Sequence, residues 1–142
     1  MFSKIMVPVD LAHREKLRAA IDVTAELART YGAEVCYVGV TTSAPSSVAH
    51  TPDEYGAKLA AFAQEQAAAH GETASSHVIV SHDPTADLDR DLVKAVTEVG
   101  ADLVVMATHV PSVTDLIWPS NGGRLATHTD VSVFLVRADA AK

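Results

Sequence analysis

The chain has 142 residues, and its 11 basic and 18 acidic residues give a net charge of −7. One domain over residues 1–142 is therefore expected, and the acidic balance argues against nucleic acid or an anionic membrane surface as a partner. The single cysteine, Cys36, excludes an internal disulfide, and no apolar run reaches the ~20 residues needed to cross a bilayer. The N-terminus enters a strand pattern without a signal peptide, so we expect a cytoplasmic protein with no direct membrane insertion.

Strand and helix patterns alternate along the chain. Near-continuous apolar runs indicate strands that are buried on both faces, and apolar residues three or four positions apart indicate amphipathic helices. The predicted strands are 4–10, 34–40, 77–81, 102–108 and 131–137, and the predicted helices are 17–29, 52–70, 88–99 and 124–128. This alternation predicts an α/β fold, a doubly wound sandwich of three layers with a five-stranded, mostly parallel sheet in the middle.

Proline, glycine and one acidic residue set the ends of several predicted elements. Pro8 brings the first strand to its end, because proline removes a hydrogen-bond donor from the sheet. Gly32 and Gly71 follow the first two helices, where a left-handed turn favours glycine, and Pro52 suits the first turn of the second helix. Asp87 is predicted to cap the third helix.

The stretch from residue 102 to 124 contains a strand, a long loop and a glycine-rich helix entry, an arrangement that often holds a phosphate group. Thr108 and His109 are candidates to line a pocket at the end of this strand, and the alternative is that His109 is an exposed or structurally bonded residue. Asp10 ends the first strand, where it either accepts a hydrogen bond from a ligand or caps the following turn. Both interpretations of Asp10 remain open from the sequence.

Signatures of other chemistry are missing from the sequence. The seven histidines are scattered without the spacing of a helical metal site. There is no nucleophile elbow, P-loop or C-x-x-C motif, and the candidate phosphate loop contains no lysine. We therefore predict no catalytic residues, and at most slow nucleotide hydrolysis.

Four segments together resemble the universal stress protein family, which has an adenine nucleotide alpha-hydrolase-like fold. They are KIMVPVD at 4–10, ELARTYGAEVCYVGV at 26–40, DLVVMATH at 102–109 and VSVFLVR at 131–137. The resemblance covers essentially the full length and implies the strand order 3-2-1-4-5. It also implies a homodimer, often built through the fifth strand (Val131 to Arg137). Some members bind ATP or AMP, and others lack the binding motif.

The binding motif of that family, G-x-x-G, nine residues and G-[ST], is degraded in this chain. Ala107 and Val110 stand where the family has its first two glycines. Counting nine residues from Val110 matches the G-[ST] pair to Ser120-Asn121, whereas counting back from the last strand matches it to Pro119-Ser120. Residues 120–123 nevertheless retain a polar, glycine-containing helix entry.

The resemblance implies that adenosine would lie over Asp10 and the second strand, with phosphates at residues 120–123. The full set of expected nucleotide contacts is Pro8, Val9, Asp10, Val38, Val40, Ala107, Thr108, His109, Val110, Ser120, Asn121, Gly122 and Gly123. One hypothesis is a regulatory protein that binds ATP or AMP in a cleft at the C-terminal ends of strands 1 and 4. The alternative is a nucleotide-free dimeric protein that regulates a transporter or another, unidentified partner.

Overall fold

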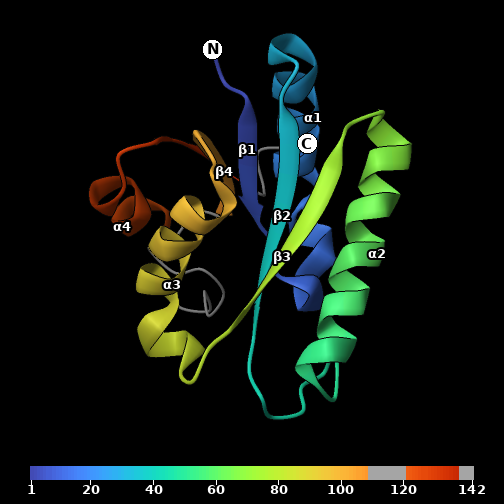
Figure 1. Ribbon diagram of the computed structural model, residues 1–142, viewed down its shortest axis with the longest axis vertical. Coiled ribbons are helices and arrows are strands. Elements are labelled where there is room, and N and C mark those ends of the chain that lie inside the picture. Colours follow the sequence, from blue (N-terminus) through green and yellow to red (C-terminus); the bar gives the residue numbers. More distant parts are fainter. Residues whose placement is uncertain (109–120, 138–142) are drawn as a thin grey trace.

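The computed structural model of the protein describes residues 1–108 and 121–137, and its elements alternate between strands and helices (Figure 1). They are β1 (Lys4–Pro8), the 3-10 helix η1 (Leu11–Lys16), α1 (Arg18–Tyr31), β2 (Glu34–Thr41), α2 (Pro52–His70), β3 (Ala74–Val80), α3 (Pro84–Val99), β4 (Leu103–Thr108), α4 (Asn121–His128) and β5 (Ser132–Arg137). The predicted alternation of strands and helices is confirmed.

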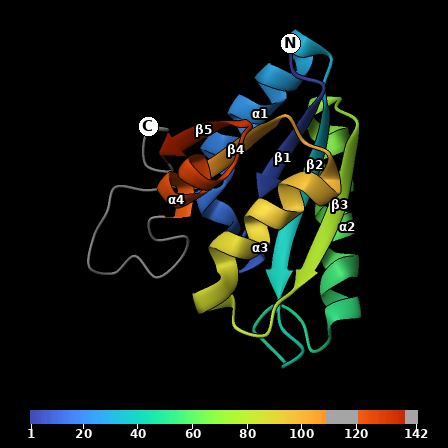
Figure 2. The ribbon, with the colours of Figure 1, turned by 60° about the vertical axis from the view of Figure 1, so that its left-hand side comes forward.

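The five strands form one parallel sheet with the order β3-β2-β1-β4-β5. Helices α1 and α2 cover one face of this sheet, and α3 and α4 cover the other (Figures 1 and 2). Each helix connects two parallel strands, which requires a crossover over one face, and α3 joins β3 to β4, which are not neighbours in the sheet. Both the predicted α/β sandwich and the strand order are therefore confirmed.

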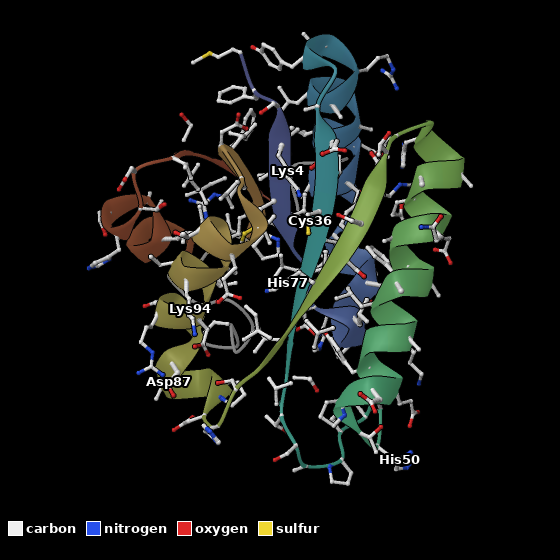
Figure 3. All side chains as sticks on the ribbon, in the orientation of Figure 1. Lys4, Cys36, His50, His77, Asp87 and Lys94 are labelled. Atoms are coloured by element: carbon white, nitrogen blue, oxygen red, sulfur yellow. The ribbon has the colours of Figure 1, made fainter. Side chains whose placement is uncertain are left out.

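Alternate residues of the central strands supply the two halves of the core. Ile5 and Val7 of β1, and Val9 just after it, pack with α1 and α2, whereas Met6 packs with α3 and α4. The same alternation places Cys36 of β2 in the second half, near the middle of the sheet (Figure 3). Cys36 is buried, and this burial raises the pKa of its thiol.

The ends of α1 and α2 follow the predicted signals. Gly32 and Gly71 adopt φ angles of 64° and 66°, the left-handed conformation that ends a helix at little cost for glycine. Pro52 opens α2, and the Thr51 hydroxyl accepts a hydrogen bond of 3.1 Å from the Glu54 N–H. These two helices therefore stop and start where local chemistry predicts.

The third helix begins earlier than predicted. Asp83, rather than Asp87, is its cap, and the Asp83 carboxylate accepts the N–H of Ala86 at 3.2 Å. Pro84 occupies the first turn, where a missing N–H costs nothing, so the helix takes in the four residues before Leu88. Two more boundaries differ: β3 begins at Ala74, and α4 begins at Asn121.

Asp102 fastens the start of β4 to the start of β1. Its carboxylate accepts the N–H of Ser3 at 2.9 Å and the N–H of Lys4 at 3.0 Å, and its own N–H donates to the Lys4 carbonyl. Partial burial alone would raise the pKa of Asp102, but the hydrogen bonds from Lys4 and Ser3 outweigh it and lower the pKa below its usual value. The charged form of Asp102 therefore stabilises the fold.

We predict that Asp102→Asn lowers the free energy of unfolding by about 1–2 kcal/mol at pH 7, because hydrogen bonds to a charged acceptor are lost. The folded-state pKa is the lower one, so this stabilisation is complete above the unfolded-state value and disappears as the pH falls through the folded-state value. Urea unfolding at several pH values between 6 and 3 measures the difference. Asp22→Asn, at an exposed position of α1, is the control, and equal pH profiles for both variants would contradict the prediction.

Candidate functional site

The C-terminal ends of β1 and β4 lie at the point where the sheet reverses its direction of growth. The chain passes from β1 to β2 and β3 on one side, and then to β4 and β5 on the other. In open α/β sheets, ligands bind in the crevice at such a switch point. This edge of the sheet is therefore the first place to look for a site.

Pro8 shapes the crevice between β1 and β4. The Lys4 carbonyl faces β4, so alternate residues of β1, including Pro8, face β4 as well. Proline has no N–H to donate, and the pairs between β1 and β4 in the described chain are Ile5 with Leu103 and Met6 with Val104. On the opposite edge, pairing with β2 continues through Pro8 and Val38. Toward its C-terminal end, β1 therefore stays paired with β2 for longer than it stays paired with β4.

Asp10 lies directly after this strand and caps η1. One carboxylate oxygen accepts the N–H of Ala12 at 3.0 Å, and the other lies 3.1 Å from Nδ1 of His13. The capping interpretation of Asp10 is therefore confirmed. Its side chain remains 25% exposed, which leaves part of the carboxylate open to a ligand.

Several predicted contacts belong to the core. Val9, Val38 and Ala107 are buried, the first and third with α1 and α2, and Val38 with α3 and α4. Val40 and Thr108, at the ends of β2 and β4, are partly buried. Val40 and Thr108 lie at the C-terminal end of the sheet, which is where the ligand contacts are expected. The buried side chains of Val9, Val38 and Ala107 leave mainly backbone atoms for a ligand to contact.

Only some of the predicted phosphate-binding residues lie in the part of the chain that the structure describes. Asn121, Gly122 and Gly123 form the first turn of α4, where backbone N–H groups lack partners within the helix. A helix N-terminus of this kind attracts anions. The other three predicted contacts in this region, His109, Val110 and Ser120, lie outside the described residues.

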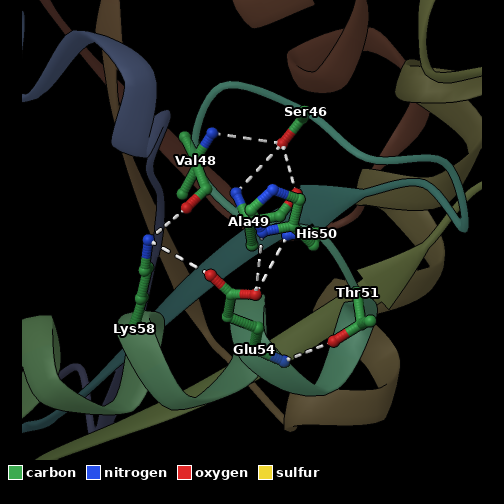
Figure 4. A network of polar contacts seen from close by, with 7 residues as sticks. All are labelled: Ser46, Val48, Ala49, His50, Thr51, Glu54 and Lys58. Atoms are coloured by element: carbon green, nitrogen blue, oxygen red, sulfur yellow. Dashed lines mark hydrogen bonds and ion pairs between the residues drawn. The ribbon is translucent and has the colours of Figure 1, made fainter.

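The loop between β2 and α2 is held by a network of polar contacts (Figure 4). The Ser46 hydroxyl accepts the N–H groups of Val48 and Ala49, and the Glu54 carboxylate accepts the N–H of His50 at 3.1 Å. That last hydrogen bond lowers the pKa of Glu54. Lys58 joins the two parts, since its ammonium group donates to the Val48 carbonyl and lies 3.6 Å from Glu54.

A hollow of about 530 Å³ lies between this loop, η1 and α2. Its lining includes Leu11, Arg14, Val48 and Lys58. Both basic side chains already have partners: Arg14 pairs with Glu65 and lies over the Phe62 ring, and Lys58 belongs to the network above. The hollow adjoins Asp10 in sequence, but the predicted nucleotide contacts are not among its lining residues.

Tyr55 of α2 reaches the end of β2 beside the crevice. The side chain is 4% exposed, and it packs against Gly39, the residue between the predicted contacts Val38 and Val40. A Cβ atom on Gly39 would lie 2.4 Å from the Tyr55 hydroxyl oxygen, so no other residue fits there without a shift. Burial raises the pKa of Tyr55 to about 12, and the negative charge of Asp10 adds to the effect.

Two structural absences bear on the chemistry of the site. Within residues 1–108 and 121–137, no group of three or more His, Cys, Asp or Glu side chains is arranged to hold a metal ion. No helix in the same described part of the chain is long and apolar enough to cross a membrane.

Comparison with known proteins identifies the fold. The universal stress protein family matches residues 1–137. This chain belongs to the universal stress protein family. The predicted resemblance is therefore confirmed over nearly the whole sequence.

Solved structures of universal stress proteins share the architecture at low sequence identity. One from Burkholderia pseudomallei has a TM-score of 0.68 and 24% identity, covering 94% of this chain and 95% of that one. One from Archaeoglobus fulgidus in complex with dAMP has a TM-score of 0.64 and 18% identity, covering 95% and 98%. One from Arabidopsis thaliana with AMP bound has a TM-score of 0.65 and 17% identity, covering 99% and 95%. At these identities the likeness establishes the fold alone.

Sequence reasoning missed two residues that the structure brings to this edge of the universal stress protein sheet. His13 contacts Asp10, and the D-x-x-H spacing at positions 10–13 was the available signal. In the sequence, Tyr55 is one member of the apolar stripe of the predicted helix 52–70, and nothing local reveals that its hydroxyl reaches β2. A contact between segments separated in sequence becomes visible when the helix is packed on the sheet.

We predict that Gly39→Ala lowers the free energy of unfolding by about 1–3 kcal/mol, because the added methyl group overpacks the Tyr55 ring. Gly56→Ala in α2 is the matched control. Its Cβ would lie 3.5 Å from the Val78 side chain, an ordinary contact, so the gain in helix propensity should stabilise the protein. Thermal and urea unfolding measure both changes, and a Gly39→Ala protein as stable as the wild type would refute the close contact.

Proposed function

We propose that this universal stress protein binds an adenine nucleotide, ATP or AMP, in the crevice at the C-terminal ends of β1 and β4. The observation that carries the proposal is Asp10, a partly exposed carboxylate fixed at the switch point of the sheet. The structures with dAMP and AMP bound support it, because they have the same fold. The proposed role is regulatory, in the cytoplasm, with nucleotide as the signal.

Asp10 is suited to recognise the nucleoside. The hydrogen bond to Ala12 fixes the carboxylate, and a fixed acceptor loses little freedom when it receives a hydroxyl or amino group from a ligand. The interaction with His13 supplies a second restraint on the same side chain. Asp10 would thus serve as a structural cap and a ligand acceptor together.

The phosphates would lie at the start of α4. The N–H groups of Asn121, Gly122 and Gly123, which the helix itself does not pair, favour an anion through hydrogen bonds and the helix dipole. The chain keeps this helix entry although it lacks the first glycines of the family motif. The proposal requires binding and release of the nucleotide, and it requires no chemistry on the bound ligand.

We predict that Asp10→Asn weakens AMP binding about tenfold to a hundredfold, because a charged acceptor is replaced by a neutral one. Asparagine can still accept the Ala12 N–H, so the cap of η1 should persist. Isothermal titration with AMP and with ATP gives the affinities, and ligand-induced thermal shifts provide a second measurement.

Asp83→Asn is the matched control for this experiment, since Asp83 is also a capping aspartate at the same edge of the sheet. It should leave the affinity unchanged. A wild-type protein that gives neither heat nor a thermal shift at high micromolar AMP and ATP would reject the proposed function.

A second candidate function is assembly through β5, either alone or together with nucleotide binding. β5 is an edge strand that pairs with β4 along one side, and the described chain offers no partner for its other side (Figure 2). Phe134 and Leu135 on this strand are 44% and 43% exposed. An edge strand with exposed large apolar residues suits pairing with a second copy about a two-fold axis. Such a dimer could then present its surface to a regulatory protein partner.

We predict that Phe134→Lys weakens self-association at least tenfold, because two copies would bring like charges together across the axis. Val80→Lys on β3 is the control, since Val80 is 55% exposed on the opposite edge of the same sheet. Sedimentation equilibrium measures the association constants. A wild-type protein that sediments as a monomer, or a dimer lost equally in both variants, would exclude pairing through β5.

A further inference from the structure

Tyr55 presents a hydroxyl group at the candidate site. The side chain is 4% exposed, and its ring and hydroxyl oxygen lie against Gly39 near the end of β2. Among the described residues the Tyr55 hydroxyl has no hydrogen-bond partner, yet its oxygen is not one of the fully buried unpaired side-chain atoms. The oxygen therefore keeps some access to the outside of the protein and is an open hydrogen-bonding group.

Tyr37 shows how the same chain treats a buried tyrosine of the core. It is fully buried on the face of the sheet that α2 covers, and its hydroxyl donates to the carboxylate of Glu72. The phenol of Tyr37 is therefore satisfied within the protein. In the described chain Tyr55 has no such partner, so its hydroxyl is left for water or a ligand.

Asp10 and Tyr55 flank the same end of the sheet. Asp10 follows β1, Gly39 lies in the neighbouring strand β2, and Tyr55 covers Gly39 from α2. Pro8 pairs with Val38, and the Val9 N–H donates to the Val38 carbonyl, so the chain leading to Asp10 runs beside Gly39. Because the hydroxyl stays protonated at neutral pH, it is a hydrogen-bond donor beside a carboxylate acceptor.

We propose that the Tyr55 hydroxyl binds the ligand directly, donating a hydrogen bond to the nucleoside part of the nucleotide while Asp10 accepts one from it. This inference rests on the proposed function and adds a residue that is absent from the predicted contacts. A nucleoside carries ring nitrogens and ribose oxygens as acceptors, together with amino and hydroxyl donors. It therefore offers a matching group to each member of the pair.

The position of Gly39 follows from the same arrangement. Its lack of a side chain lets the phenol approach the backbone of β2, at the level where the predicted contacts Val38 and Val40 lie. The Tyr55 side chain belongs to the same core cluster as Leu59 and Phe62, and its hydroxyl lies against Gly39 near the end of β2. Tyr55 is thus a binding residue held in place by a close contact with the strand.

The test compares Tyr55→Phe with the wild type by isothermal titration using AMP and adenosine. We expect binding of both ligands to weaken by a similar factor, about threefold to tenfold, the equivalent of one neutral hydrogen bond. The melting temperature of the ligand-free variant should equal that of the wild type, because the hydroxyl has no hydrogen-bond partner to lose in the described chain. Tyr31→Phe is the matched control, since Tyr31 is an exposed tyrosine at the end of α1.

A Tyr55→Phe protein that is folded and binds both ligands as tightly as the wild type would overturn the inference and leave the proposed function standing. A wild-type protein that binds neither AMP nor adenosine would overturn both. A second measurement uses the unaltered protein: the NMR signal of the carbon that bears the hydroxyl should shift for Tyr55, and stay in place for Tyr31, when AMP is added. Absence of that shift in a protein saturated with AMP would also refute the contact.

Discussion

The pairing of β1 with its two neighbours is the constraint on which the rest of the structure depends. β1 is the central strand, and its side chains feed both halves of the core. Asp102 fastens its first residues to β4, whereas Pro8 provides no N–H toward β4 at its other end. β1 and β4 are thus joined at the N-terminal end of the sheet and separate at its C-terminal end, where parallel α/β sheets bind their ligands.

The groups around that C-terminal end combine structural and functional roles. Asp10 fixes the turn into η1 and retains an exposed part of its carboxylate. Tyr55 fills space against Gly39 and keeps a hydroxyl that has no hydrogen-bond partner among the described residues. Such groups are positioned before any ligand arrives, so binding requires little reordering of the protein. This arrangement is what the proposed nucleotide binding requires in a chain that lacks the first glycines of the family motif.

Most of the fold could be predicted from local patterns, because buried parallel strands and amphipathic helices have different spacings of apolar residues in the sequence. Gly32 and Gly71 were located correctly as helix ends for the same reason. The strong apolar stripe after Asp87 predicts that α3 starts there, but Pro84 permits a start one turn earlier, with Asp83 as the cap. Two possible capping residues lie close together here, and the tertiary structure selects the first of them.

By itself, the sequence determined the family, the order of the elements and the place of Asp10 at the end of the first strand. Those features depend on residue patterns within a few positions of one another. Tertiary structure alone decided that Tyr55 meets Gly39 and that Val38 and Ala107 turn into the core. These outcomes depend on which face of the sheet each side chain takes and on how α2 packs across it, and such contacts join segments that are separated along the chain.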